Sequence, residues 1–386
     1  MEVKVDVGVS NLSKEGEEVC GDTTDIIKNQ KSTTAILSDG LGSGIKASIL
    51  SILSTEITSR LIETNLEIKE VFKTIADTLP ICKERGLAYS TLSILNINDE
   101  GKAHLIEFDN PSLIIIRDNE MLSLEKEKRV IAGKEVSEAF FDVELEDVLI
   151  MVSDGVINAG VGGLFPLGLG EDRLIEKILP INMKQEEAQT IADKIMDLTD
   201  AFYLSQPGDD STSIIMKPRK PKKVVVLTGP PENEFRDKQV VDKFTQYEDF
   251  EKVVCGGTTS QIVARELNKE IKTSLDYIDS SVPPTASIEG IDVVTEGILT
   301  LNKSMEKLKN VNNKNELESQ KEKDGATILA RTLLEADQIH FLVGKSVNPA
   351  HEDLMKSMQI KPRTKTVGEI VNELRNKGKK IEVEKC

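Results

Sequence analysis

The sequence predicts two domains, an α+β domain followed by an α/β domain whose sheet is mostly parallel. Its 386 residues are too many for one ordinary domain and suit two. The segment 218–223 has two prolines, four basic residues and no apolar side chain, which is typical of a linker. Beyond it, short apolar runs alternate with helical patterns, as in a parallel α/β sheet. We therefore predict domains at 1–217 and 224–386, joined by this linker.

Composition indicates a soluble protein and disfavours several classes of partner. The net charge of −17 makes the chain a poor electrostatic match for nucleic acid or anionic membranes. No apolar run approaches the roughly 20 residues of a membrane helix, and the alternating residues after Met1 do not resemble a signal peptide. Four scattered cysteines and three distant histidines favour neither a zinc site nor a disulfide framework. We expect a reduced, cytoplasmic setting with no nucleic-acid or membrane partner.

Elements of the first domain are expected from their periodicity. Residues 3–9 alternate like a half-buried strand. The apolar run that ends at Leu37 predicts a strand that delivers Asp39, and after three glycines the apolar residues from 45 to 61 recur at helical spacing. Further strands are expected at 90–97, 102–108, 113–117, near 140–145, at 148–153 and at 213–216, and further helices at about 66–83, 171–179 and 184–202.

The second domain has four apolar runs that end in turns of small residues. The runs are 224–227, 252–254, 291–294 and 339–343. Glycine-rich turns before helices can bind anions, and parallel strands present such turns at one edge. The turns therefore indicate either a site for a small anionic ligand or ordinary α/β connections. The residues that would gather at this edge are Gly229, Gly256, Gly257, Thr258, Gly297, Gly344 and Lys345.

Four loops of the first domain present an aspartate beside a glycine or a second aspartate. They are Gly21–Asp22, Asp39–Gly40, Asp154–Gly155 and Gly208–Asp210. Any one of them is more simply a capped corner between a strand and a helix. Together they form an all-oxygen donor set, which suits Mg²⁺ or Mn²⁺. Two such ions that share a bridging carboxylate can hold a hydroxide for in-line attack on phosphorus, so no protein nucleophile would be needed.

The order of these motifs resembles the metal-dependent (PPM, PP2C-like) protein serine/threonine phosphatases. The motifs are Gly-Asp, Leu-Ser-Asp-Gly-Leu-Gly-Ser-Gly-Ile-Lys-Ala, Ser-Thr-Leu, Val-Ser-Asp-Gly-Val and Asp-Asp-Ser-Thr, and they cover about residues 1–217. The form Asp-Gly-Leu-Gly-Ser-Gly is similar to the branch typified by stage II sporulation protein E. The resemblance implies an αββα sandwich of two antiparallel sheets flanked by helices, and a role in bacterial signalling such as sporulation.

The resemblance also implies a site. Of two Mn²⁺ or Mg²⁺ ions, Asp39 would bridge both, Asp154 and Asp209 would bind the first, and Asp22 and the carbonyl of Gly40 would bind the second directly or through water. Asp210 would lie beside these ligands, more as their support than as a ligand itself. Asp22, Asp39, Asp154 and Asp209 would form the catalytic set. Eukaryotic members place an arginine just ahead of the residue that corresponds to Asp22. Here Lys14 is the only basic residue nearby, so substrate binding should differ.

The function that this resemblance implies is hydrolysis of phosphoserine or phosphothreonine in a partner protein by the metal-bridged hydroxide. The partner would be a phosphoprotein, by resemblance one of the anti-anti-sigma type. Two alternatives stay open: a metal-dependent hydrolase of a small phosphorylated metabolite, and a degenerate phosphatase that acts as a regulatory binding protein. The intact ligand positions argue against the second alternative. For the domain at 224–386 we recognise no family, and we expect it to regulate the first domain or to bind a ligand.

Overall fold

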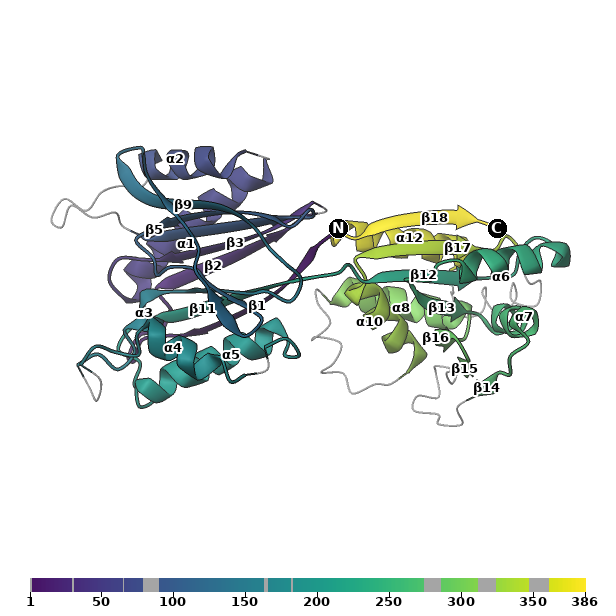
Figure 1. Ribbon diagram of the computed structural model, residues 1–386. Helices are drawn as coiled ribbons and strands as arrows, with labels where there is room; N and C mark the ends of the chain where they lie inside the picture. Colours follow the sequence, from purple (N-terminus) through teal and green to yellow (C-terminus); the bar gives the residue numbers. More distant parts are fainter. Residues whose placement is uncertain are drawn as a thin grey trace. The chain divides into compact units, whose positions relative to one another are not determined.

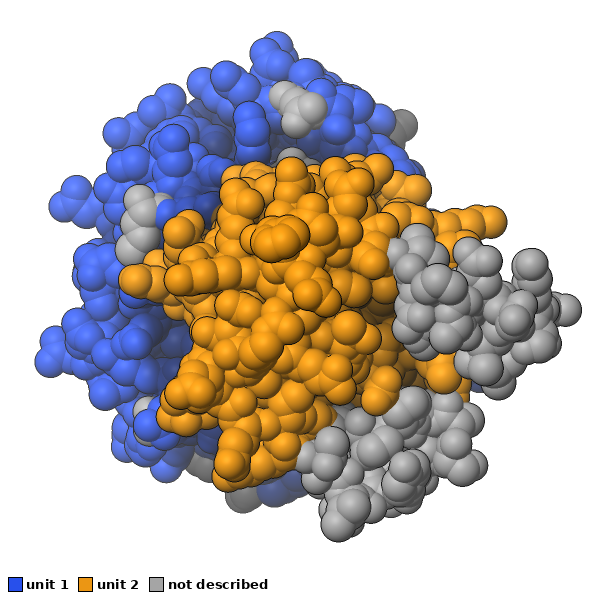
Figure 2. Space-filling view, turned by 90° about the vertical axis from the view of Figure 1, so that its right-hand side faces the viewer, with its two compact units in different colours: residues 1–220 blue, residues 221–386 orange. Residues whose placement is uncertain are grey.

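The computed structural model describes residues 2–29, 31–64, 66–78, 90–162, 166–181, 183–273, 286–311, 324–346 and 361–386. The chain divides into two compact units, Met1–Lys220 (unit 1) and Pro221–Cys386 (unit 2) (Figure 1, Figure 2). Pro218 and Arg219, which we expected in the linker, continue the last strand of unit 1, and Lys223 begins the first strand of unit 2. Only residues 220–222 therefore lie between these strands. No helix in the described ranges is long and apolar enough to cross a membrane.

Unit 1 contains two sheets whose strand pairs are all antiparallel. The five-stranded sheet has the order β1-β11-β10-β6-β7, and the six-stranded sheet has the order β2-β3-β4-β5-β9-β8. The five strands are β1 (Lys4–Leu12), β6 (Ile114–Arg117), β7 (Glu120–Leu122), β10 (Val148–Val152) and β11 (Ser211–Arg219). The six strands are β2 (Asp22–Lys28), β3 (Ser32–Asp39), β4 (Leu92–Asn98), β5 (Lys102–Phe108), β8 (Glu127–Ile131) and β9 (Lys134–Asp142).

Helices cover the outer face of each sheet, so unit 1 has four layers (Figure 1). The helices are α1 (Gly44–Glu63) and α2 (Ile68–Thr78) on the six-stranded sheet, α4 (Glu171–Ile178) and α5 (Ala188–Phe202) on the five-stranded sheet, and the short α3 (Asp154–Ile157) after β10. Neighbouring residues of β3 serve different layers, because Ile36 packs with α2 and Leu37 packs between the sheets. Burial on both faces explains why this strand is continuously apolar in sequence. The αββα arrangement implied by the motifs is confirmed.

Helix α1 buries its small hydroxyl side chains and exposes most of the apolar ones in its first half, whereas Ile57, Leu61 and Ile62 near its end are partly buried beside α2. The exposed apolar residues are Ile45 (63%), Ile49 (59%), Ile52 (46%) and Leu53 (44%). On the opposite face, the hydroxyl of Ser51 hydrogen-bonds with that of Thr23 at 2.7 Å, and the hydroxyl of Ser54 with that of Ser90 at 2.6 Å. These buried hydroxyls are therefore satisfied against the end of the sheet. The apolar periodicity marks a real helix, but its buried face is the Ser/Thr face.

Unit 2 contains one mixed sheet with the order β14-β15-β16-β13-β12-β17-β18. The strands are β12 (Lys223–Thr228), β13 (Glu251–Cys255), β14 (Lys272–Thr273), β15 (Ala286–Ile288), β16 (Ile291–Thr295), β17 (Gln338–Val343) and β18 (Lys380–Lys385). In the sheet, the five adjacent strands β16, β13, β12, β17 and β18 are parallel, whereas β14 and β15 add an antiparallel edge. The expectation of a mostly parallel sheet is thus correct for these five strands. It missed the edge pair, whose members have two and three residues and leave almost no periodic signal.

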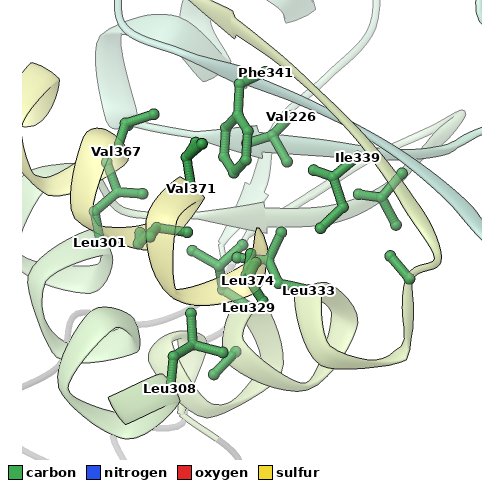
Figure 3. Close-up of a cluster of buried hydrophobic side chains, with 14 of the residues drawn as sticks. Val226, Leu301, Leu308, Leu329, Leu333, Ile339, Phe341, Val367, Val371 and Leu374 are labelled. Atoms are coloured by element: carbon green, nitrogen blue, oxygen red, sulfur yellow. The ribbon is translucent and has the colours of Figure 1, made fainter. Parts of the chain in front are cut away.

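Helices pack on both faces of this sheet. They are α6 (Asp237–Thr245), after the short 3₁₀ turn η1 (Glu234–Arg236), and α7 (Gly257–Leu267) on one face, with α8 (Ile298–Asn310), α10 (Gly325–Glu335) and α12 (Arg363–Asn376) on the other. Figure 3 shows the second face, where Val226 and Phe341 of the sheet lie near Val371 of α12. Val225 and Leu227 point to the α6–α7 face instead. This double coverage makes the central strands apolar throughout.

Candidate metal centre

Asp22 and Asp39 lie opposite each other at one end of the β2–β3 pair, because Asp22 begins β2 and Asp39 ends β3. Thr91 fixes the backbone of Asp39 from the start of the next strand. The N–H of Asp39 donates to Thr91 Oγ1 at 3.0 Å, and its carbonyl accepts from the Thr91 N–H at 2.9 Å. At the following residue, Gly40, a Cβ would lie 2.0 Å from the carbonyl oxygen of Ala47. Only glycine therefore lets α1 approach this strand end so closely.

The five-stranded sheet supplies the other three aspartates. Asp154 is the first residue of α3 and follows β10 after the single residue Ser153, and Asp209 and Asp210 directly precede β11. Since β10 pairs with β11, the two loops are neighbours. The N–H of Thr212 donates to Ser153 Oγ at 2.9 Å, and the N–H of Ser153 donates to the Thr212 carbonyl at 3.0 Å. These bonds hold the two strand ends together.

Close packing also fixes the position of α3. A Cβ at Gly155 would lie 2.0 Å from the carbonyl oxygen of Asp210, so the first turn of α3 touches the start of β11. The hydroxyl of Tyr203 donates to the Gly155 carbonyl at 2.8 Å. Burial raises the pKa of this Tyr203 hydroxyl to about 12, and the charge of Asp209 adds to the rise. Tyr203 is therefore a neutral support of the acidic cluster, and no sequence pattern marked it.

The raised pKa of Asp39 indicates that aspartates from both sheets lie close to one another. Burial is the largest cause of the raised pKa of Asp39, which reaches about 8. The negative charges of Asp22, Asp154 and Asp209 raise it further, in that order. Asp22 and Asp39 come from one sheet, whereas Asp154 and Asp209 come from the other. A cluster of this kind disfavours ionisation unless a cation offsets the charge.

Asp22 is the clearest indication that the cluster suits a cation. Its side chain is 7% exposed, and in the described part of the chain neither carboxylate oxygen has a hydrogen-bond partner. Burial raises its pKa to about 6, and the nearby hydroxyls of Ser153 and Thr212 oppose this rise without forming hydrogen bonds of normal geometry. A buried carboxylate without partners is costly, and Mg²⁺ and Mn²⁺ prefer oxygen ligands. The donor set therefore fits a hard divalent cation.

Asp210 and Asp209 differ in their surroundings. Asp210 is 3% exposed, and its Oδ1 accepts the backbone N–H of Lys14 at 3.0 Å. Its Oδ2 is buried without a partner in the described residues and would lie 2.7 Å from a Cβ at Gly21. Burial and the charge of Asp154 raise the pKa of Asp209, whereas the charge of Lys14 opposes this rise. One oxygen of Asp210 thus has a structural role in holding the backbone at Lys14.

These aspartates lie near one another but do not form a complete coordination site. Within the described ranges, no three Asp, Glu, His or Cys side chains converge as the ligands of one ion. The pKa shifts nevertheless require the carboxylates to lie within electrostatic range of one another. The assignment of individual ligands stays a prediction.

Comparisons with known proteins agree with this architecture. A family model described as "Stage II sporulation protein E (SpoIIE)" matches residues 29–219. The stage II sporulation protein E of Bacillus subtilis (strain 168) is 26% identical over 224 residues, which cover 55% of this chain and 26% of that protein. The protein of the same name from Priestia megaterium is 24% identical over 218 residues, covering 55% and 36%. The chain thus matches well under two thirds of each curated relative.

A solved structure shows the same fold. It contains the PP2C phosphatase domain and a fragment of the regulatory domain of SpoIIE from Bacillus subtilis. Its TM-score is 0.50 at 21% identity, and the match covers 56% of this chain and 63% of the solved one. The fold is that of the PP2C phosphatases. Unit 1 is therefore similar to the PP2C-like domain of SpoIIE proteins, as its motifs indicated.

Proposed function

We propose that unit 1 hydrolyses phosphoserine or phosphothreonine in a partner protein of a bacterial signalling pathway, with Mg²⁺ or Mn²⁺ as its cofactor. The observation that supports this most is the cluster of Asp22, Asp39, Asp154 and Asp209, which come from two sheets; burial and the charges of neighbouring aspartates raise the pKa of Asp22, Asp39 and Asp209. The SpoIIE-type fold supports the same reaction class. The partner protein and the individual ligands are part of the proposal.

In this proposal Asp39, Asp22 and the Gly40 carbonyl would hold one ion. Asp39, Asp154 and Asp209 would hold the other. Ions bound there would lower the pKa of a water molecule and neutralise charge on the phosphoryl group. Thr91 holds the backbone of Asp39 at the strand end through two hydrogen bonds, so the point from which this carboxylate extends is fixed without an ion.

Lys14 is the residue that we propose to attract the substrate phosphate. Its charge opposes the raised pKa of Asp209, so its ammonium lies within electrostatic range of the cluster. Its backbone N–H donates to Asp210 Oδ1 at 3.0 Å, and this bond holds the loop between β1 and β2 beside the site. A single flexible lysine positions phosphate less rigidly than an arginine does. Discrimination between phosphopeptides should therefore depend on contacts outside the cluster.

The test is phosphate release from phosphopeptides and from phosphorylated metabolites, with and without Mn²⁺. Asp39→Asn and Asp154→Asn should each lose at least about a hundredfold of the metal-dependent rate. The matched control is Asp142→Asn, which removes an exposed carboxylate at the end of β9 whose partner is Lys102 at 2.7 Å. That control should keep the parent rate.

Each other result would overturn a stated part of the proposal. Rates within about tenfold of the parent for both site variants would contradict the metal centre. Turnover of metabolites but not of phosphopeptides would favour the small-molecule hydrolase. A folded chain that releases phosphate from no substrate with either metal would favour a degenerate phosphatase that acts by binding.

A further inference from the structure

Unit 2 has a topological switch point between β12 and β17. These strands are parallel neighbours, and the first helix described after β12 is α6 on one face, whereas the first described after β17 is α12 on the other. Open α/β sheets bind ligands outside the carboxyl ends of the strands at such a point. Here Gly229 follows the last residue of β12 and Gly344 follows the last residue of β17, and the Gly344 N–H donates to the Thr228 carbonyl at 2.9 Å. The two loops therefore form one connected edge.

A guanidinium lies at this edge. Arg363, the first residue of α12, donates from Nη1 to the carbonyls of Gly344 and Ser346, both at 3.3 Å. A Cβ at Gly229 would lie 1.7 Å from the same Nη1, so Gly229 must lack a side chain for Arg363 to be there. Among the described residues no carboxylate forms an ion pair with Arg363. Burial lowers the pKa of its guanidinium, as expected for a cation without a neighbouring anion.

The N-terminus of α7 adjoins the same loop. Thr259, in the first turn of α7, accepts the Gly229 N–H on its Oγ1 at 3.0 Å. The N-cap of this eleven-residue helix is Gly256, no side chain caps it, and its first turn has no acidic residue. Thr258, beside the free N–H groups, is exposed. Uncapped N–H groups and the helix dipole attract an anion.

Two further features lie along this carboxyl edge. The N-cap of α8 is Gly297, where a Cβ would lie 3.5 Å from Gly256 Cα, so α7 and α8 begin side by side. Thr228 at the end of β12 and Thr300 in the first turn of α8 are both 0% exposed, and in the described part of the chain their hydroxyl oxygens have no hydrogen-bond partner. Buried polar groups without partners are uncommon in folded proteins. Two buried hydroxyl groups at this edge are thus left without a hydrogen-bond partner in the described part of unit 2.

We propose that the carboxyl edge of unit 2 binds a small phosphate ester, with Arg363 and the N-terminus of α7 as its phosphate ligands. A guanidinium and a helix start approach from different elements, which suits the several oxygens of a phosphate better than the two coplanar oxygens of a carboxylate. Glu296 is exposed, and its Oε2 lies 3.8 Å from the position of a Gly257 Cβ. Its charge opposes a bare anion but accepts a hydroxyl, so an ester that carries hydroxyl groups is favoured over inorganic phosphate.

The turn after β12 makes a dinucleotide a poor candidate. Thr228 is followed by Gly229, Pro230 and Pro231, not by the Gly-x-G-x-x-G pattern of dinucleotide-binding folds. A sugar phosphate or a nucleoside monophosphate therefore fits the edge better. This site lies within unit 2, and the inference does not depend on the phosphatase activity proposed for unit 1.

Calorimetric titration of the full chain with inorganic phosphate, ribose 5-phosphate and AMP tests the proposal. EDTA is present throughout, so that no divalent ion in unit 1 can bind the probes. Arg363→Gln should weaken binding of the esters by at least about tenfold, the effect of losing one charged hydrogen-bond donor. The matched control is Lys365→Gln, which removes the same charge from an exposed position two residues along α12. This control variant should bind the esters with the same affinity as the parent protein.

A second pair of variants separates binding from folding. Thr258→Glu places a negative charge in the first turn of α7, which stabilises the helix but repels an anion. We expect binding to be lost with an unchanged or higher melting temperature, whereas Thr258→Gln should bind like the parent. Three outcomes would overturn the proposal: equal weakening by Lys365→Gln and Arg363→Gln, no effect of Arg363→Gln and Thr258→Glu, or no heat from any probe at about 10 mM.

Discussion

Replacing Asp39 with asparagine should abolish phosphatase activity and yet stabilise unit 1 when no metal is bound. Burial and the charges of Asp22, Asp154 and Asp209 raise the pKa of Asp39 to about 8 in the folded protein. The unfolded value is about 3.9. The folded state therefore keeps a proton that the unfolded chain releases between about pH 4 and pH 8. The stability of the metal-free protein falls as the pH rises through this window, and the asparagine variant lacks that fall.

The size of the effect follows from the same shift. Each pKa unit is worth about 1.4 kcal/mol, but Asp39 is partly exposed and water screens part of the repulsion. We therefore expect Asp39→Asn to raise the free energy of unfolding by about 2 kcal/mol at pH 8. For a unit of this size that corresponds to about 4–8 °C in melting temperature. The gain should shrink towards pH 5.

Thermal unfolding in EDTA at pH 5 and pH 8 measures this difference. Asp142→Asn removes an exposed charge from the same unit and should shift the free energy by less than about 0.5 kcal/mol. Added Mn²⁺ should raise the melting temperature of the parent by mass action, but should raise that of Asp39→Asn much less. A variant less stable than the parent at pH 8, or a difference independent of pH, would refute the reasoning.

Four further predictions follow from the structure. EDTA should remove all activity and Mn²⁺ or Mg²⁺ should restore it, because every proposed ligand is an oxygen; best rescue by Zn²⁺ would contradict the site. Gly40→Ala should lower the free energy of unfolding by about 1–3 kcal/mol and remove most of the activity, because its Cβ would lie 2.0 Å from the Ala47 carbonyl oxygen. Gly368→Ala is the control and should be tolerated, because its Cβ would have no atom within 4 Å. Denaturant titrations of both variants measure the difference. Asp324→Ala should cost unit 2 about 1 kcal/mol, because Asp324 caps α10 through two backbone N–H groups at 2.8 and 3.0 Å. Burial raises the pKa of Asp324, but the hydrogen bond from the Thr327 hydroxyl, the two backbone bonds and the charge of Lys307 outweigh it, so the pKa is lowered. Urea titrations should therefore show the stabilisation above about pH 4 and its loss at lower pH. Finally, a chain of residues 1–220 should keep metal-dependent turnover in the phosphopeptide assay; if it folds but is inactive, unit 2 is part of the active site.

Local patterns were sufficient for much of unit 1. The strand before Asp39 and the strand before Asp154 are short apolar runs that end in Ser-Asp-Gly, and they appear as β3 and β10. These corners depend on neighbouring residues, so the sequence contains them in full. The order of the motifs also indicated the similarity to SpoIIE proteins, which the match over residues 29–219 confirms. The roles of the individual aspartates as ligands stay predictions.

Periodicity could not say which face of a helix is buried. The spacing of Ile45, Ile49 and Leu53 predicts α1 correctly, yet these side chains are exposed. The sheet end beside Gly40 has room only for small side chains, and Ser51 and Ser54 fit there because their hydroxyls find partners on Thr23 and Ser90. In this case hydrogen bonding and close approach outweighed burial of the larger apolar groups.

By itself, the sequence determined the strand–turn corners, the helices and the set of acidic residues, because each is encoded within a few neighbouring positions. Only the tertiary structure decided how they meet. The register of β2 and β3 sets Asp22 opposite Asp39, and the packing of two sheets brings Asp154 and Asp209 within electrostatic range of Asp39. In unit 2, Arg363 reaches Gly229 across most of the domain's sequence. Such contacts depend on strand register and on the exclusion of side chains at a few glycines, which no local pattern specifies.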